Sequence, residues 1–302
     1  MESLPSLFRL TTEAVAQIVD ATPDPRSETP CSEWNHAQVL GHLVGGDRLF
    51  ARILLGEAGA PVGARIAPDA DRAAPTPADY RRISGRLGEL FARPETTSGT
   101  YAVPVGRLPG PQVILLRSVE HLLHGWDLAK SAGVSTAGLE PAAEELEGPA
   151  RALLAGVGEL TLGGRRPFAP PIVVADDADP MTRMVAAFGR DPEWTPDHVG
   201  GYARLLERFH DHDDVELPDG TRRGYGADGM RVNNQVFACT YQGRLMIKLP
   251  KTDVDDLIAA GLARPLAKPG QRPMREWALV PFDGSAEERA ERAYAFVSGR
   301  RD

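Results

Sequence analysis

The residues best suited to chemistry are polar side chains that interrupt an apolar helical face. Five residues between positions 111 and 132 follow one another at spacings of three or four and so share one face of a predicted helix. They are Val113, Leu116, Glu120, His124 and Asp127. A buried carboxylate is costly unless it is hydrogen-bonded, paired with a cation or bound to a metal. Glu120 and His124 are therefore either a local hydrogen-bonded pair or two ligands of a metal ion.

His42 offers a third ligand from a neighbouring helix. It lies three residues after Val39 and seven before Leu49 on an apolar face, so its imidazole is predicted to point into the helical core. There it is either a hydrogen-bonded core histidine or a metal ligand. Two histidines and one glutamate form a recognised zinc ligand set, which leaves one position open for water or substrate.

Other candidate ligands carry weaker signals. The two cysteines, Cys31 and Cys239, show no zinc-binding spacing, so any metal is expected to be held by histidine and carboxylate. His121 lies about 100° off the polar stripe and is expected to be structural or exposed. Residues 210–214 (HDHDD) have the composition of a second metal site, but they are interpreted as a solvated helix end.

These residues are predicted to lie on helices that are joined by loops. Apolar periodicity predicts helices over about 4–19, 33–56, 77–91, 111–132, 140–160 and 181–189. Ser32 is the expected N-cap of the second helix. Thr76 followed by Pro77 matches the rules for a helix N-terminus, and Gly133 is expected to close the fourth helix. Residues 93–108 are interpreted as a loop or a short strand. As a whole, residues 1–195 are predicted to form an all-α bundle.

A change of periodicity near residues 191–196 marks the expected domain boundary. After one more helix, the chain alternates in the strand pattern and carries tight-turn residues. Asn233 and Asn234 predict a hairpin, because asparagine tolerates the positive φ of a primed turn, and Gln242 with Gly243 predicts another. A short helix (253–261), a strand (276–281) and a terminal helix (286–298) complete the pattern. Residues 196–302 are therefore predicted to form a small α+β domain.

Composition narrows the classes of function. The 302 residues are 42% hydrophobic and 25% charged, as in ordinary globular proteins, and the net charge of -8 argues against a dedicated nucleic-acid binder. No run of about eighteen apolar residues and no secretory signal are visible, so a cytosolic protein without membrane contact is expected. Gly45 and Gly46 are interpreted as sites of close helix packing, because no phosphate-binding fingerprint surrounds them.

Four motifs form an ordered series over about residues 5–195. They are residues 30–34 (PCSEW), 41–47 (GHLVGGD), 120–129 (EHLLHGWDLA) and 187–194 (AFGRDPEW). This series resembles the DinB-like metal-binding family of the mycothiol-dependent maleylpyruvate isomerase N-terminal type. The resemblance implies a DinB-like four-helix bundle that binds a divalent metal, zinc in the family, through His42, Glu120 and His124.

The resemblance also implies an enzyme. Characterised members use the metal to activate a low-molecular-weight thiol such as mycothiol, for isomerisation or for S-transfer to a small electrophilic substrate, because metal coordination deprotonates a thiol. The isomerase has a different C-terminal domain, which favours S-transfer here. Asp127 is expected to orient His124 or to contact substrate. The alternative is a non-catalytic protein that binds a metal and a ligand for sequestration or regulation.

The second domain has motifs of its own. They are residues 232–233 (VN), 236–238 (VFA), 245–250 (LMIKLP), 254–257 (VDDL) and 270–277 (GQRPMREW). Over about residues 205–298 they resemble the TfoX N-terminal or YjbR-like α+β family. In an enzyme, this domain is expected to act as a lid, as a wall of the substrate pocket or as the surface of a homodimer. In the non-catalytic alternative it is an interaction module.

Overall fold

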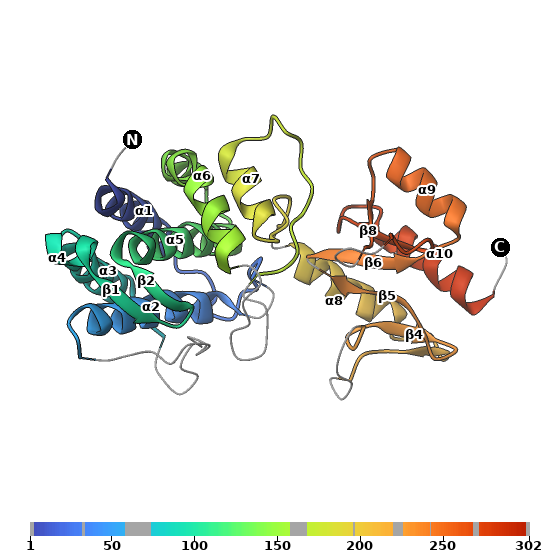
Figure 1. The fold of residues 1–302 in the computed structure, drawn as a ribbon. Coiled ribbons are helices and arrows are strands. Elements are labelled where there is room, and N and C mark those ends of the chain that lie inside the picture. Colours follow the sequence, from blue (N-terminus) through green and yellow to red (C-terminus); the bar gives the residue numbers. More distant parts are fainter. Residues whose placement is uncertain are drawn as a thin grey trace. The chain divides into compact units, whose positions relative to one another are not determined.

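The structure is a computed structural model, and it describes residues 3–31, 34–57, 74–157, 168–195, 197–219, 226–241, 243–267 and 272–299. The chain divides into two compact units, residues 1–193 and 194–302. The N-terminal unit is mainly helical and the C-terminal unit contains a sheet (Figure 1). In the parts of the chain that the structure describes, no helix combines the length and the apolar character needed to cross a membrane.

Four helices form the core of the N-terminal unit. They are α1 (Leu4–Val19), α2 (His36–Leu54), α3 (Pro77–Phe91) and α5 (Gly110–Ala132). Both α1 and α2 pack against α3 and α5, which closes the bundle (Figure 1). Each helix buries an apolar stripe, as Leu7, Leu43, Leu87 and Leu122 illustrate. The prediction of a helical bundle in this part of the chain is confirmed.

Further elements surround this bundle, and one of them corrects the prediction of an all-α unit. Between α3 and α5 lie α4 (Pro94–Ser98) and an antiparallel hairpin of β1 (Thr100–Val103) and β2 (Gly106–Pro109). Strands of four residues are too short to show a clear period, and the turn depends on Gly106, whose φ of 129° favours glycine. After α5 come η1 (Ala137–Leu139), α6 (Glu140–Val157) and α7 (Pro180–Ala187).

Most helix ends follow the predicted signals. Thr76 caps α3 in a reciprocal capping box, and Gly133 closes α5 with a φ of 66°. The start of α2 differs from the prediction, because its N-cap is Asn35, which forms a capping box with Gln38. The expected cap, Ser32, lies outside the described residues.

The C-terminal unit is an antiparallel sheet with helices. Its helices are α8 (Asp197–Phe209), α9 (Lys251–Ala259) and α10 (Ala286–Ser298). Its strands are β3 (Val215–Glu216), β4 (Met230–Val232), β5 (Gln235–Tyr241), β6 (Arg244–Lys248), β7 (Arg264–Pro265) and β8 (Trp277–Val280). They pair in the order β3-β4-β5-β6-β8-β7. Side chains of α8, α10 and the sheet, among them Phe209, Phe237, Ile247 and Ala290, share one buried core.

The hairpin between β4 and β5 confirms the prediction from its two asparagines. Asn233 and Asn234 have φ values of 52° and 60°, the left-handed conformation that a primed turn requires. β5 and β6 pair antiparallel around the second predicted turn, where Gln242 lies outside the described residues.

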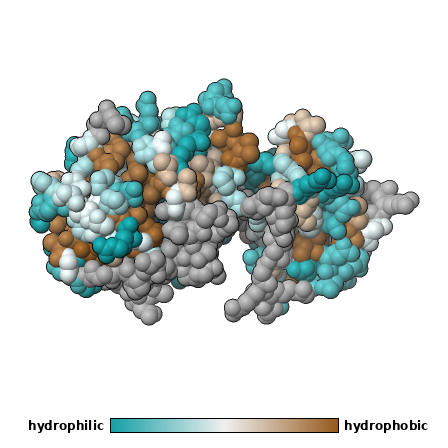
Figure 2. Space-filling model, in the orientation of Figure 1, coloured by the Kyte–Doolittle hydropathy of each residue, from teal (hydrophilic) through white to brown (hydrophobic). Residues whose placement is uncertain are grey.

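Few large apolar side chains are exposed among the described residues. They are Leu55, Val173, Leu262, Met274 and Phe296, which belong to five different segments. On the face drawn in Figure 2, hydrophilic residues are interspersed with apolar ones over both units. Single exposed apolar side chains are common on protein surfaces, so they do not by themselves indicate a docking site.

Helices α2 and α5 approach closely at Gly46. A Cβ added at Gly46 would lie 2.7 Å from Nη1 of Arg117 in α5, whereas a Cβ added at Gly45 would meet nothing within 4 Å. The prediction of close packing is therefore confirmed for Gly46 and wrong for Gly45. Because Arg117 is completely buried, it cannot move into solvent to make room.

Gly46→Ala should destabilise the N-terminal unit by about 1–3 kcal/mol, the usual cost of overpacking a core. Gly45→Ala is the matched control on the same helix, and it should stabilise the unit by about 0.5–1 kcal/mol because alanine favours the helix. Urea unfolding followed by circular dichroism measures both effects. Equal effects of the two substitutions would contradict the close approach at Gly46.

Candidate metal centre

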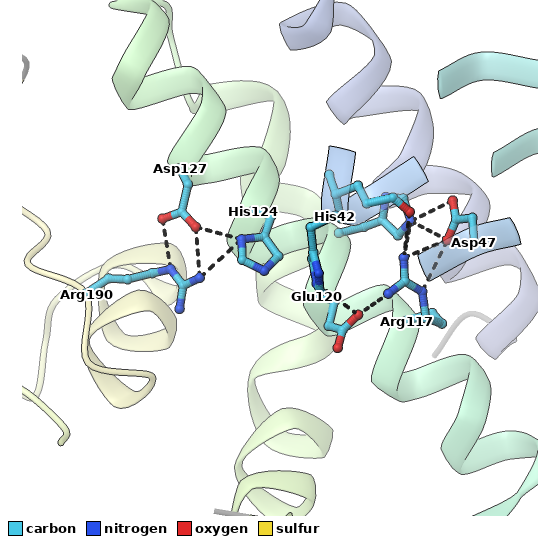
Figure 3. A network of polar contacts seen from close by, with 9 residues as sticks. His42, Asp47, Arg117, Glu120, His124, Asp127 and Arg190 are labelled. Atoms are coloured by element: carbon cyan, nitrogen blue, oxygen red, sulfur yellow. Dashed lines mark hydrogen bonds and ion pairs between the residues drawn. The ribbon is translucent and has the colours of Figure 1, made fainter. Parts of the chain in front are cut away.

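Helices α2 and α5 pack against each other and carry most of the site. The polar side chains form two sets of polar contacts (Figure 3), which meet where the rings of His42 and His124 lie side by side. From one end to the other the labelled residues are Arg190, Asp127, His124, His42, Glu120, Arg117 and Asp47. His42 and Asp47 come from α2, Arg190 follows α7, and the other four come from α5. Sequence segments far apart in the chain therefore meet in one cluster.

The three predicted metal ligands lie together at the centre of this cluster. Nε2 of His42 is 3.9 Å from Oε2 of Glu120, and the rings of His42 and His124 have centroids 4.9 Å apart. The side chains are 9%, 21% and 10% exposed for His42, Glu120 and His124, respectively. The structure therefore brings the three side chains to one mostly buried place, with Glu120 nearest to solvent. That they bind a metal stays a prediction.

Asp127 binds the Nδ1 side of His124, and Arg190 in turn binds Asp127. Nδ1 of His124 is 2.9 Å from Oδ2 of Asp127, and Arg190 donates to both oxygens of that carboxylate at 2.9 and 2.8 Å. Burial alone would raise the pKa of Asp127, but the charge of Arg190 and the hydrogen bonds outweigh burial and lower it. An ionised Asp127 accepts only, so Nδ1 of His124 must donate the proton.

The other ring nitrogen of His124 is therefore available to a ligand. Burial lowers the pKa of His124, and the hydrogen bond that His124 donates to Asp127 opposes this shift only in part. The imidazole is neutral at pH 7, so with its proton on Nδ1 the lone pair is on Nε2. A histidine whose second nitrogen is bound by a carboxylate is the usual form of a metal-binding histidine.

Arg117 joins Glu120 to Asp47 at the other end of the cluster. Its Nη1 donates to Oε2 of Glu120, and its Nη2 donates to Oδ1 of Asp47 at 2.7 Å and to the carbonyl oxygen of Leu43 at 3.2 Å. Both Arg117 and Asp47 are fully buried. One guanidinium therefore orients the carboxylate of Glu120 relative to α2.

Asp47 is the centre of a buried network that completes this end. Its carboxylate lies 3.0 Å from Nε2 of His121 and accepts from Oγ of Ser84 at 2.6 Å. The hydroxyl of Tyr80 lies 2.8 Å from Nδ1 of His121. Burial alone would raise the pKa of Asp47, but the charges of His121 and Arg117 and the hydrogen bonds hold it well below its usual range. His121 is therefore structural and completely buried, one of the two outcomes expected for it.

The segment before α2 adds two residues to the site. The indole of Trp34 lies 4.5 Å from the ring of His42 and 5.7 Å from the ring of His124, measured between centroids. Ligand atoms of Cys31, His124 and Asp127 all lie within 4.8 Å of one another. The prediction that any metal rests on histidine and carboxylate did not include this thiol, because Cys31 is far from His124 along the chain.

His42 and Glu120 lie at a separation that suits a divalent cation, but among the described residues the group of three candidate ligands within 4.8 Å of one another is Cys31, His124 and Asp127. Ligand atoms of a tetrahedral zinc site lie about 3.4 Å apart, because each is about 2.0–2.1 Å from the ion, and the 3.9 Å between His42 and Glu120 is close to this separation. The cluster contains three carboxylates and two guanidinium groups in addition to its histidines.

The acidic histidine segment at the end of α8 is different. The side chains of His210 and Asp211 are 76% and 99% exposed, and Nδ1 of His210 is 3.3 Å from Oδ1 of Asp211. The interpretation of this segment as a solvated helix end is confirmed for His210 and Asp211, whereas the half-buried ring of His212 packs against Phe209 and Tyr294.

Comparison with known proteins places the bundle in a family. Residues 8–129 match the Mycothiol maleylpyruvate isomerase N-terminal domain. Uncharacterized protein Rv0738 of Mycobacterium tuberculosis (strain ATCC 25618 / H37Rv) is 35% identical to the chain over 163 residues, which are 54% of this chain and 82% of that protein. Uncharacterized protein MT0763 of strain CDC 1551 / Oshkosh shows the same values. No solved structure matches the chain.

The chain therefore belongs to the family of the mycothiol maleylpyruvate isomerase N-terminal domain. The matched residues include His42, Glu120, His124 and Asp127 and end before Arg190. The family is metal-binding and related to mycothiol, and the residues around His124 form a candidate site for the metal.

Asp47→Asn tests the buried network and should destabilise the N-terminal unit by about 3–5 kcal/mol at pH 7, because Arg117 stays buried with less counter-charge. The pKa of Asp47 is lower in the folded chain than its unfolded value near 3.9. Its contribution is therefore complete above about pH 5 and is lost as the pH falls below about 4. Wild-type protein should lose stability on acidification more steeply than Asp47→Asn.

The free energy of unfolding in urea, measured from neutral pH down to about pH 3, gives both the loss of stability in Asp47→Asn at pH 7 and the acid sensitivity of each protein. Asp176→Asn, at an exposed position of the same unit, is the control and should resemble wild type. Identical acid sensitivity of wild type and Asp47→Asn would contradict the account of this network.

Proposed function

We propose that the chain is a metal-dependent enzyme of the mycothiol-type thiol S-transferase or isomerase class. In this proposal a thiolate attacks a small electrophilic substrate. The observation that carries it is the meeting of His42, Glu120 and His124 at one mostly buried place, with Asp127 bound to the far nitrogen of His124. S-transfer is the better supported of the two reactions, because the C-terminal unit does not carry the isomerase's sequence motifs.

The proposed metal ligands are His42, Glu120 and His124, and the proposed ion is zinc. A free thiol has a pKa near 8.5 and is mostly protonated at pH 7; a divalent cation at this site would stabilise the thiolate of mycothiol. The proposed partners are thus a small thiol and a small electrophile.

The chain's own residues prepare the site. Asp127 fixes the proton of His124 on Nδ1, and Arg190 fixes Asp127. Arg117 orients Glu120, since its Nη1 donates to Oε2 of that carboxylate. The indole of Trp34 covers the two histidines on one side, which excludes water from that side of the site. An apolar wall beside charged groups strengthens their interaction with a bound ion.

One observation favours a second candidate function, a protein that binds a metal and a ligand without turnover. Both carboxylates nearest to the histidines are already bound to arginines, Glu120 to Arg117 and Asp127 to Arg190. Neither is therefore well placed to act as a general acid or base. S-transfer by a preformed thiolate does not need a general acid or base. Binding for sequestration or regulation does not need one either, so the same arrangement also suits a non-catalytic protein.

For the C-terminal unit we propose the TfoX or YjbR-like identity. The sequence resemblance and the α+β arrangement with a six-stranded antiparallel sheet support it. In the enzyme this unit would act as a lid, as a wall of the pocket or as the surface of a homodimer. In the binding protein it would act as an interaction module. The net charge of -8 does not favour nucleic acid as its partner.

Metal content is the first test of this proposal. Protein purified without chelators should bind about one zinc ion per chain, as expected for one site with three protein ligands. His42→Ala should lose the metal, and His210→Ala, which removes an exposed histidine, should retain it. Elemental analysis and competition with a chromogenic chelator measure binding, while circular dichroism checks the fold. Retention of zinc by His42→Ala would contradict the proposed ligand set.

The role of Asp127 separates catalysis from binding. Asp127→Asn should retain zinc and lose about 10- to 100-fold in rate, because the amide no longer fixes His124 in the right tautomer. Glu120→Gln should lose zinc and activity together. The assay is conjugation of mycothiol to 1-chloro-2,4-dinitrobenzene at pH 7, below the pKa of a free thiol. If the zinc-loaded wild type shows no conjugation with this or other electrophiles, the non-catalytic alternative is favoured.

A further inference from the structure

A cavity of the N-terminal unit lies between the end of α2 and the exposed side of α3. Its volume is about 360 Å³, which is within the range of about 300–1,000 Å³ typical of small-molecule sites. The lining comes from Leu55, the C-cap of α2, from α3 itself and from Arg93, which follows α3. None of these residues belongs to the candidate metal centre, so the cavity is a separate feature of the unit.

Charged side chains form a stripe along this cavity. Arg82, Arg86, Glu89 and Arg93 line it and follow one another at spacings of four, three and four residues, as neighbours on one face of a helix do. Arg82 is paired with Asp79 at 2.8 Å. Among the described residues, neither Arg86 nor Arg93 forms an ion pair with a carboxylate. Two guanidinium groups are therefore available here, with Glu89 as the one acidic group of the lining.

Apolar side chains form the rest of the lining. Leu90 is buried, Ile83 is half-buried and Leu55 is 36% exposed. Backbone hydrogen bonds hold both sides of the cavity, because the N–H of Leu55 donates to the carbonyl oxygen of Ala51 at 3.1 Å and that of Arg93 to the carbonyl oxygen of Leu90 at 3.2 Å. An apolar group placed here would be removed from water, which is favourable. The cavity thus combines an apolar surface with a cationic edge.

We propose that this cavity binds a small organic anion. Arg86 and Arg93 hold its carboxylate or phosphate group, and its apolar part covers Leu55 and Leu90. A guanidinium group binds either oxyanion through parallel N–H···O bonds, so arginine suits both. Glu89 disfavours a ligand with several negative charges, since it would repel the additional ones. The inference does not depend on the proposed function, because the metal centre contributes no residue to it.

Octyl phosphate and octanoate are the probes, because each joins one of the two oxyanions to an apolar chain. Inorganic phosphate and 1-octanol are the reference compounds, since each has only one of the two features. Isothermal titration calorimetry of the full-length protein at pH 7, below the concentration at which the probes form micelles, measures binding. At least one alkyl anion should bind more tightly than both reference compounds.

Variants locate the binding. Arg86→Gln/Arg93→Gln should weaken binding of that probe by about 10-fold or more, because charge-assisted hydrogen bonds are lost. Leu55→Ser should weaken it by about 3- to 10-fold through lost apolar contact. The matched control is Arg9→Gln/Arg151→Gln, which removes two positive charges at exposed positions of the same unit and should bind as wild type does. Circular dichroism checks that each variant folds.

Each outcome decides the proposal. Equal weakening in the two double variants would show that only overall charge attracts the anion, and would overturn it. Failure of wild type to bind either alkyl anion would overturn it as well. His42→Ala should bind the probe as wild type does, and loss of binding there would place the anion at the metal centre instead. Sedimentation with phosphatidylglycerol vesicles that depends on Arg86 and Arg93 would assign the anion to a membrane surface and contradict a small ligand.

Discussion

The buried guanidinium of Arg117 is the group on which the arrangement of the site depends. It lies between Asp47 of α2 and Glu120 of α5 and bonds to both, in space that Gly46 leaves open. A buried charge is tolerated only where its partners satisfy it, so this contact fixes how the two helices face each other. Because of it, His42 and His124, one from each helix, meet with Glu120 beside them.

The same principle operates at the other end of the cluster, where Arg190 holds Asp127 and Asp127 holds His124. Arg117 thus fixes the position of Glu120, Arg190 fixes that of Asp127, and burial lowers the pKa of His124. The result is a mostly buried cluster of nitrogen and oxygen donors beside the indole of Trp34. Such a cluster is a candidate site for a divalent cation.

Local patterns predict much of this structure, and contacts between distant segments account for the rest. Helical periodicity identifies α5 and places Glu120 and His124 on one face, because that geometry depends only on spacing. The pairing of Arg117 with Asp47 joins residues 70 positions apart, and that of Arg190 with Asp127 joins residues 63 apart. Periodicity cannot assign such partners. The spacing of three residues between Arg117 and Glu120 on a buried helix does, however, indicate that these two charges pair. The sequence predicts the segment of β1 and β2 only as a loop or a short strand, because strands of four residues are too short to show a period.

The central claim is that His42, Glu120 and His124 bind one divalent metal, and zinc K-edge X-ray absorption spectroscopy on protein loaded with one equivalent of zinc tests it most directly. The account predicts nitrogen and oxygen ligands at about 2.0–2.1 Å, with outer-shell scattering from two imidazole rings that falls to one ring in His42→Ala. A spectrum of oxygen ligands alone, without imidazole scattering, would contradict the account.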